Sequence, residues 1–441
     1  MKFDDYSPPT LPSLDQQRDA LRKGLGRAMQ WAMSRRLDDT PLMEACLRDQ
    51  RFDMSVEDSR GDWLWQMIQA VGGTDRFRVP ILREFHDISD DYSAGQLCEL
   101  AKHYARKGDP AFRTRLYEIV ERKPFVNSPW LGEEEIIELD GESALLFAIN
   151  VRGRGLANRK WAWDDERLIE QATERLGEGP VSQLLDNATD EAVCAFQRMW
   201  RQRMKEKPEQ EPALSHKERV KAITVAEIVA AAESEDTGFG MFRGWGMHAD
   251  PTDLGIVLRR LWAAQEPKVI AKFLTVFSNR ALPDFDARLI ELCQHSDAEV
   301  RRRAFSALEK NTHRLIREFA FAGLAKGLSD GSVVGLFINN YEQGDEHRIL
   351  EAMEFPADEC ELHWLLMDVN KVLEKNSQAD ASQLAMITYA STPCENCRFF
   401  ALRLLHNQKA VPEWVKEECR YDSGQDCREL IEKALESTKV A

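Results

Sequence analysis

The chain has 441 residues, of which 43% are hydrophobic, and carries a formal net charge of −16 at pH 7. This hydrophobic content is typical of a folded protein and excludes a chain that is disordered throughout. The acidic balance argues against non-specific nucleic-acid binding and docking on anionic membranes, and no stretch approaches the roughly 18 apolar residues that a membrane-spanning helix needs.

The first part of the chain predicts a short tail followed by a block of helices. Residues 1–12 contain three prolines and lack the apolar core of a secretory signal, so we expect a loose tail and no export by that route. Apolar residues then recur at helical spacing over most of residues 13–204, without the alternation that would indicate a sheet. We therefore expect an N-terminal helical repeat block over 13–204.

An acidic run interrupts the helical pattern near the middle of this block. Residues 133–140 hold four glutamates and an aspartate, with Glu134 among the first of them. Such a run is usually a solvated face and less often a surface for a basic partner. In the second case, Glu134 is the residue that we expect to contact the partner.

A basic and aromatic patch follows closely. Arginine and tryptophan together can hold phosphates and stack nucleic-acid bases. Acidic residues 164–166 come directly after the patch and reduce its charge, which favours a solvated loop leading into a helix. The nucleic-acid hypothesis stays open as the alternative, and its candidate residues are Arg152, Arg154, Arg159, Lys160 and Trp161.

Residues 205–216 are charged, contain prolines and lack periodicity, so they predict a linker or long loop before a C-terminal block over 217–441. Early in this block, residues 237–248 (TGFGMFRGWGMH) place four glycines among aromatic residues and methionines. The stretch lacks the Lys-Ser/Thr pair of a phosphate-binding loop. It predicts a flexible loop that either folds back over the helices or offers an adaptable contact surface made by Phe239, Phe242 and Trp245.

A nine-residue phrase recurs in the C-terminal block. VRRRAFSAL begins at Val300, and CRFFALRLL and CRELIEKAL begin at Cys397 and Cys427. Fainter copies begin at Val269 and Val333, which lie 31 residues before and 33 residues after Val300. A period of about 31–35 residues is typical of stacked helix pairs, because each pair has an apolar face that it cannot bury alone.

The phrase resembles HEAT-like repeats, in which antiparallel helix pairs stack and an aspartate and an arginine often form a ladder along the stack. This resemblance implies an all-α fold, an armadillo-like α-solenoid of stacked antiparallel helix pairs. It does not imply one activity, because the family includes scaffolds, DNA-repair glycosylases and bilin lyases. The Asp–Arg spacing is present at Asp297 and Arg301 and at Asp109 and Arg113, and is absent at Arg398 and Arg428.

Nine cysteines, most of them at apolar positions, indicate buried thiols in a reducing compartment, and we expect a cytoplasmic protein. Cys394 and Cys397 form a CxxC pair, but Cys419 and Cys427 are too far apart to form a second zinc knuckle. Cys397 also occupies the core-facing position that Val300 has in its own copy of the phrase. This pattern favours small buried side chains over a redox pair or a zinc site, which remain alternatives.

No HExxH, GxSxG or kinase pattern occurs, so the sequence predicts no catalytic residue, no cofactor and no metal. We expect a non-enzymatic scaffold or adaptor that binds a protein partner through Phe239, Phe242, Trp245 and Glu134. The alternative is a nucleic-acid-binding or DNA-repair-type enzyme on the same scaffold, which would use the basic and aromatic patch.

Overall fold

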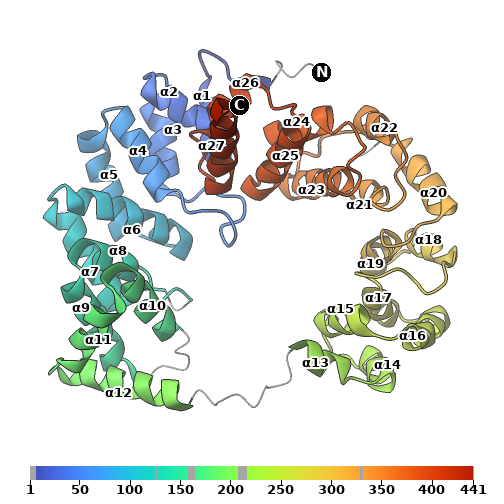
Figure 1. Ribbon diagram of the computed structural model, residues 1–441, viewed down its shortest axis with the longest axis horizontal. Coiled ribbons are helices and arrows are strands. Elements are labelled where there is room, and N and C mark those ends of the chain that lie inside the picture. Colours follow the sequence, from blue (N-terminus) through green and yellow to red (C-terminus); the bar gives the residue numbers. More distant parts are fainter. Residues whose placement is uncertain (1–5, 126, 157–163, 207–215, 328–330, 441) are drawn as a thin grey trace. The chain divides into compact units, whose positions relative to one another are not determined.

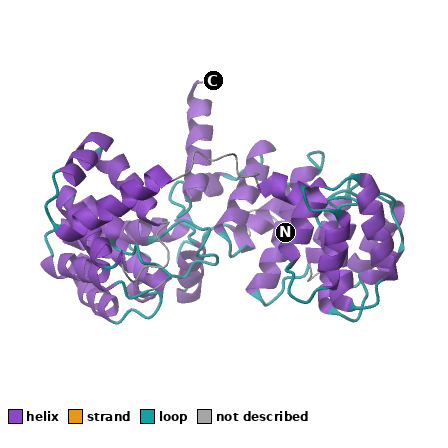
Figure 2. Cartoon of the chain, turned by 90° about the horizontal axis from the view of Figure 1, so that it is seen from below, coloured by secondary structure: helices purple, strands orange, loops and turns teal. Residues whose placement is uncertain are grey.

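The structure is a computed structural model that describes residues 6–125, 127–156, 164–206, 216–327 and 331–440. The secondary structure in these ranges is helical and includes no β-strand (Figure 2), which confirms the predicted all-α fold class. No helix in the described part of the chain has the length and apolar character needed to cross a membrane. The predicted linker over 205–216 lies largely outside the described residues.

The chain divides into two compact units. We call one the split unit, because it comprises Ser7–Gln210 together with Glu413–Ala441. We call the other the inserted unit, because its main part, Glu211–Pro412, lies between those two segments in the sequence. The last residues of the chain, which the sequence analysis assigned to the block over 217–441, therefore pack with the N-terminal helices.

The helices of the split unit are labelled in Figure 1. They are α1 (Leu14–Lys23), α2 (Gly26–Met33), α3 (Asp39–Leu47), α4 (Gly61–Ala70), α5 (Thr74–His86), α6 (Asp91–Arg106), α7 (Pro110–Arg122), α8 (Glu133–Asp140), α9 (Glu142–Arg154), α10 (Asp164–Leu176), α11 (Glu178–Asp186), α12 (Glu191–Glu206), α26 (Glu413–Cys419) and α27 (Gln425–Val440).

The inserted unit is built in the same way (Figure 1). Its helices are α13 (His216–Lys221), α14 (Val225–Glu233), α15 (Phe239–His248), α16 (Pro251–Ala263), α17 (Pro267–Val276), α18 (Arg288–Leu292), α19 (Ala298–Leu308), α20 (Arg314–Leu324), α21 (Gly331–Gly335), α22 (Asp345–Ala352), α23 (Glu359–Lys375), α24 (Ser382–Ser391) and α25 (Glu395–Asn407).

Alternate helices pack side by side within each unit. In the split unit, α1, α3, α5, α7 and α9 contact one another in order, and so do α2, α4, α6, α8 and α10. In the inserted unit, the odd-numbered helices from α13 to α25 form such a series. Sequence neighbours such as α5 and α6 or α24 and α25 also pack together. Helices thus bury an apolar face against neighbouring helices, as the apolar stripe of the repeated phrase predicts.

The repeated phrase shows how these helices begin. Asp297 accepts a hydrogen bond from the backbone N–H of Val300 at 3.0 Å and caps α19. Capping by aspartate satisfies one of the backbone donors that a helix start leaves unpaired.

The arginine of the phrase fixes the turn that precedes its own helix. Arg301 donates to the carbonyls of His295 and Ser296 at 2.7 and 2.8 Å. Arg428 reaches the equivalent carbonyls, including that of Ser423 at 2.6 Å. Asp297 and Arg301 therefore have different partners: the aspartate caps the helix, while the arginine, which has five donors, bonds to backbone oxygens.

Ion pairs join successive elements of the split unit. Arg78 of α5 pairs with Asp109, which caps α7, through a hydrogen bond of 3.0 Å. Arg113 of α7 pairs in turn with Asp140 at the end of α8. Asp109 and Arg113 thus each pair with a residue of another element.

The described part of the predicted loose tail is held against the helices. The indole N–H of Trp31 donates to the carbonyl of Pro9 at 3.3 Å, and Arg36 donates to the carbonyl of Thr10 at 3.0 Å. The prolines that suggested a loose tail have no N–H of their own, but the backbone carbonyls around them remain available as acceptors.

The C-terminal helices complete the split unit. Glu418 of α26 is fully buried and pairs with Arg27 of α2 at 2.5 Å. Trp63 of α4 donates its indole N–H to the carbonyl of Tyr421 at 2.8 Å. A β-carbon added to Gly26 would lie 1.8 Å from the carbonyl oxygen of Glu418, so only glycine permits this close approach of α2 and α26.

Candidate functional site

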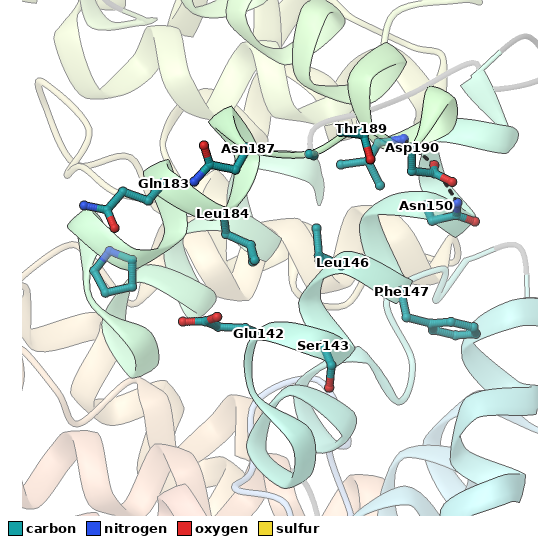
Figure 3. A pocket seen from close by; sticks show the side chains of 13 residues that line it. Glu142, Ser143, Leu146, Phe147, Asn150, Gln183, Leu184, Asn187, Thr189 and Asp190 are labelled. Atoms are coloured by element: carbon teal, nitrogen blue, oxygen red, sulfur yellow. Dashed lines mark hydrogen bonds between the residues drawn. The ribbon is translucent and has the colours of Figure 1, made fainter.

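A groove of about 850 Å³ lies among α9, α11 and the start of α12 in the split unit (Figure 3). Its floor contains partly buried apolar side chains that pack against the core of this unit. Those side chains are Leu146, Phe147, Leu184 and Ala188.

Helix α9 can line the groove because it is apolar on two faces. Leu145, Ala148 and Ile149 are fully buried and face the core. Residues 143, 146, 147 and 150 recur at spacings of three and four, and all four line the groove. Positions with these spacings share one side of a helix. One stripe of the helix therefore packs against the core, and the other lines the groove.

Helix α11 supplies the opposite wall. Val181 and Leu185 of this helix are buried, while Leu184 is only partly covered and lies across from Leu146 (Figure 3). Two leucines on facing helices leave an apolar strip between them. An apolar strip of this kind gains free energy when a partner covers it.

One end of the groove is fixed by hydrogen bonds around Asp190. Its Oδ1 accepts from the side chain of Asn150 at 2.8 Å and from the backbone N–H groups of Ala192 and Val193 at 3.0 Å each. These bonds hold the pKa of Asp190 below its usual value, with the bond from Val193 contributing most. Gly153 lets α12 approach, because a β-carbon there would lie 2.0 Å from the carbonyl oxygen of Ala192.

The charged groups that line the groove are acidic. Glu142 begins α9 at one end, and Asp190 stands at the other end near Asn150 (Figure 3). Within the described residues, the lining includes no lysine or arginine. The groove thus offers an apolar strip between two carboxylates, an arrangement suited to binding.

The structure separates the residues of the predicted basic and aromatic patch. Arg152 is 1% exposed and donates to Glu133 at 3.0 Å and to Asp165 at 2.8 Å. Arg154 is exposed at the surface and pairs with Glu121 at 3.3 Å. The other members, Arg159, Lys160 and Trp161, lie outside the described residues.

The predicted acidic run is largely used in internal ion pairs. Glu134 accepts hydrogen bonds from Arg175 at 2.8 Å and from Gln171 at 3.1 Å. Glu138 pairs with Lys102 at 3.0 Å. Burial, together with a nearby carboxylate, raises the pKa of Glu135 to about 8. The run therefore joins α8 to its neighbours and is not a uniformly solvated face.

The glycine-rich stretch forms helix α15 and not the predicted loop. Phe242 is fully buried, Trp245 is 3% exposed, and the indole N–H of Trp245 donates to the carbonyl of Ile223 at 2.8 Å. Phe239 is only partly covered and lies under the guanidinium of Arg303. Two of the three predicted contact residues are thus in the core, and only Phe239 reaches the surface.

Two glycines of α15 give a matched test of this packing. A β-carbon at Gly246 would lie 1.9 Å from the carbonyl oxygen of Val276, whereas one at Gly240 would meet nothing within 4 Å. We expect Gly246→Ala to destabilise the inserted unit by about 1–3 kcal/mol through overpacking. We expect Gly240→Ala to stabilise it by up to about 1 kcal/mol, because alanine favours helix.

Chemical denaturation of both variants measures this difference directly. A Gly246→Ala protein as stable as the wild type would show that α15 and α17 do not approach each other as closely as described.

The groove residues are not among those that the sequence predicts as functional. The double stripe of α9 is visible in residues 144–151 as apolar side chains at every position except Asn150. That pattern predicts a helix covered on two sides, but it does not reveal that α11 leaves one of those sides partly open.

Comparison of the chain with protein-family models, with curated proteins and with solved structures found no match.

Proposed function

We propose that this protein is a non-enzymatic scaffold or adaptor that binds a basic, amphipathic segment of a protein partner in the groove between α9 and α11. The observation that carries this proposal is the apolar strip around Leu146 and Leu184 with carboxylates at its two ends. An amphipathic helix in an apolar groove is a recurring mode of peptide recognition.

The spacing of the two carboxylates suggests what the segment looks like. Glu142 and Asn150, which bonds to Asp190, are eight residues apart on α9, or about 12 Å at 1.5 Å per residue. A helical partner would match this separation if it carried two cations about seven or eight residues apart. Its apolar residues would stand three or four positions after the first cation. The lack of basic groups in the described lining favours such a cationic partner.

The arrangement of helices supports the scaffold part of the proposal. We infer that the series of alternate helices in each unit is an α-solenoid of HEAT-like helix pairs. The support is the recurring phrase and the packing of each odd-numbered helix on the next. Stacked helix pairs create extended surfaces that commonly bind other proteins.

The nucleic-acid alternative has weaker support. Phosphate binding needs arginines whose donors reach solvent, but the donors of Arg152 are directed to two buried carboxylates. Arg154 is exposed, yet it stands beside Glu121. We therefore favour the protein-binding function.

A designed helical peptide tests the proposal. The peptide carries lysines at positions i and i+7 and leucines at i+3 and i+4, and its control carries glutamates in place of the lysines. We expect the lysine peptide to bind at least about 10-fold more tightly, a difference of 1.4 kcal/mol in binding free energy. Fluorescence anisotropy with labelled peptides measures both affinities.

Two variants of the protein locate the binding site. Leu184→Lys places a cation in the apolar strip and should weaken binding of the lysine peptide at least about 10-fold. Leu315→Lys makes the same change at an exposed leucine of α20 and should leave the affinity unchanged. Equal binding by the wild type and the Leu184→Lys protein, with unchanged circular dichroism, would contradict the proposal.

A further inference from the structure

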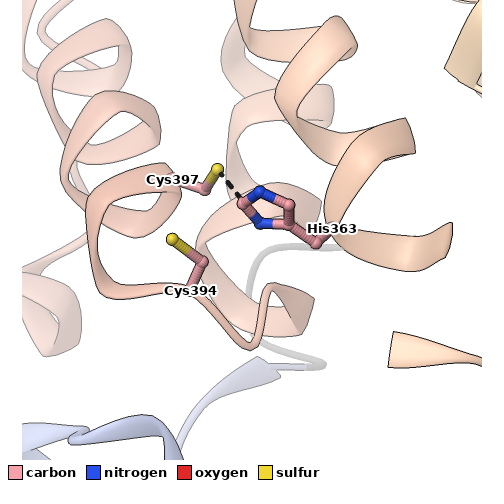
Figure 4. A group of neighbouring side chains, drawn as sticks. All are labelled: His363, Cys394 and Cys397. Atoms are coloured by element: carbon pink, nitrogen blue, oxygen red, sulfur yellow. Dashed lines mark hydrogen bonds between the residues drawn. The ribbon is translucent and has the colours of Figure 1, made fainter. Parts of the chain in front are cut away.

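Two cysteines and a histidine of the inserted unit meet between α23 and α25 (Figure 4). One potential ligand atom from each of His363, Cys394 and Cys397 lies within 4.8 Å of the other two. Within the described part of the chain, no other group of three such residues comes together in this way.

The local sequence explains why the two sulfurs converge. Cys394 is the residue that precedes α25, and Cys397 lies in its first turn. A CxxC pair at a helix start brings both side chains to the same end of the helix, because three residues make nearly one turn. Figure 4 shows the sulfur atoms of both cysteines next to the imidazole ring of His363.

The histidine comes from the neighbouring helix, and a hydrogen bond fixes the two helices in register. His363 lies in the first part of α23, and Asn370 lies two turns further along the same helix. The side-chain amide of Asn370 donates to the carbonyl of Cys397 at 3.0 Å. Asn370 is buried, so this bond is shielded from water and holds the start of α25 against α23.

The separation of the Cys397 sulfur and the His363 imidazole fits a tetrahedral metal ion. The sulfur of Cys397 is 3.7 Å from Nδ1 of His363. Zinc binds cysteine sulfur at about 2.3 Å and histidine nitrogen at about 2.0–2.1 Å, so two such ligands at the tetrahedral angle stand about 3.6 Å apart. Both cysteines are 4% exposed, whereas His363 is only partly covered, so an ion between them would retain access to solvent.

The chemistry of the three side chains suits a zinc ion. The thiolate is the form of cysteine that binds metal ions, and two thiolates with an imidazole are suited to zinc.

We propose that the inserted unit binds one zinc ion through Cys394, Cys397 and His363, with the fourth coordination position open to water. Three protein ligands with an open position are typical of zinc sites at which a water or a further ligand binds. This proposal is independent of the groove in the split unit, because the two sites share no residue.

Metal content and cobalt spectroscopy test the site. The full-length protein, purified without chelator, should contain about one zinc per chain. After removal of zinc, titration with Co²⁺ alone should produce sulfur-to-cobalt charge-transfer bands and the visible bands of a tetrahedral ion. Cys394→Ser and Cys397→Ser should each abolish most of the signal, and His363→Ala should weaken cobalt binding at least about 10-fold.

Cys293→Ser is the matched control, because it removes a buried cysteine of the same unit outside the cluster. It should keep the wild-type metal content and spectrum. Circular dichroism of each variant establishes that the fold is intact, and His363→Ala tests the site without changing a buried cysteine.

Two results would overturn the proposal. One is a wild-type protein that contains no zinc and gives no tetrahedral cobalt spectrum, or that binds cobalt equally well after both cysteines are replaced. The other is a disulfide between Cys394 and Cys397 in most molecules isolated with rapid thiol alkylation. Mass spectrometry would detect that disulfide, and the cluster would then be a dithiol redox pair.

Discussion

Replacing Arg152 by alanine is expected to lower the free energy of unfolding of the split unit by about 3 kcal/mol. The substitution leaves the buried carboxylates of Glu133 and Asp165 without the guanidinium between them. Loss of one partner from a buried ion pair typically costs about 3–5 kcal/mol. We expect the lower end of this range, because Lys123 remains near Glu133 and Arg203 remains near Asp165.

Arg154 provides the control, since it lies two residues away on the same helix and pairs with Glu121 at the surface. Arg154→Ala should change the free energy of unfolding by less than about 1 kcal/mol. Urea denaturation followed by circular dichroism measures both variants. If Arg152→Ala were as stable as the wild type and instead weakened binding to DNA or RNA, Arg152 would be a phosphate-binding residue and the nucleic-acid alternative would regain support.

This pair of arginines shows where prediction from the sequence ends. Both stand in the same basic stretch, and their neighbours do not distinguish them. The partners of Arg152 lie 19 residues before it and 13 residues after it, so its burial depends on tertiary packing. Local charge patterns therefore predicted a surface patch where the structure has an internal ion pair.

The repeated phrase was more informative because it reports a periodic contact. Val300, Ala304, Ala307 and Leu308 are all fully buried, as their spacing predicted. Arg301 was harder to interpret, because an arginine in the first turn can bond to carboxylates or to backbone carbonyls, and the turn geometry decides between them. The sequence could thus predict the helices and their core faces, but not the roles of their polar groups.

The repeat period also relates the residues of the cysteine and histidine cluster. His363 and Cys397 are 34 residues apart, which is one repeat period. In stacked repeats, residues one period apart belong to neighbouring helices of the same row, and here these helices are α23 and α25. Local cysteine spacing does not point to His363, because this residue is close to Cys397 only through the packing of α23 on α25.

The groove could not be predicted in the same way. Its apolar strip depends on how far α11 stands from α9, whereas the contacts at Gly153 and Asp190 fix the start of α12 against α9. A sequence shows that Leu184 is apolar. It does not show that the neighbouring helices leave Leu184 partly uncovered.

Removal of residues 413–441 is expected to unfold the split unit while the inserted unit remains folded. The deleted segment contributes four apolar side chains that are at most 1% exposed, namely Val415, Cys419, Cys427 and Ile431. Burial of Val415 and of Ile431 contributes about 1.5–3 kcal/mol each, and the smaller cysteines add less, so the loss is a large part of the stability of a typical domain, which is about 5–15 kcal/mol. The deletion also takes the buried partner of Arg27 and the acceptor of the Trp63 indole.

Limited proteolysis with mass spectrometry distinguishes the two units in the shortened protein. Cleavage should spread through residues 7–206, while peptides from 216–407 stay protected as in the wild type. A synthetic peptide with the sequence of 413–441 should restore protection when added in excess, and a scrambled peptide should not. Restoration would show that the split unit needs its C-terminal helices because they complete its core, and not because they join it to the rest of the chain. Wild-type protection of residues 7–206 without the peptide would instead mean that the N-terminal helices fold alone and that α26 and α27 only dock on them.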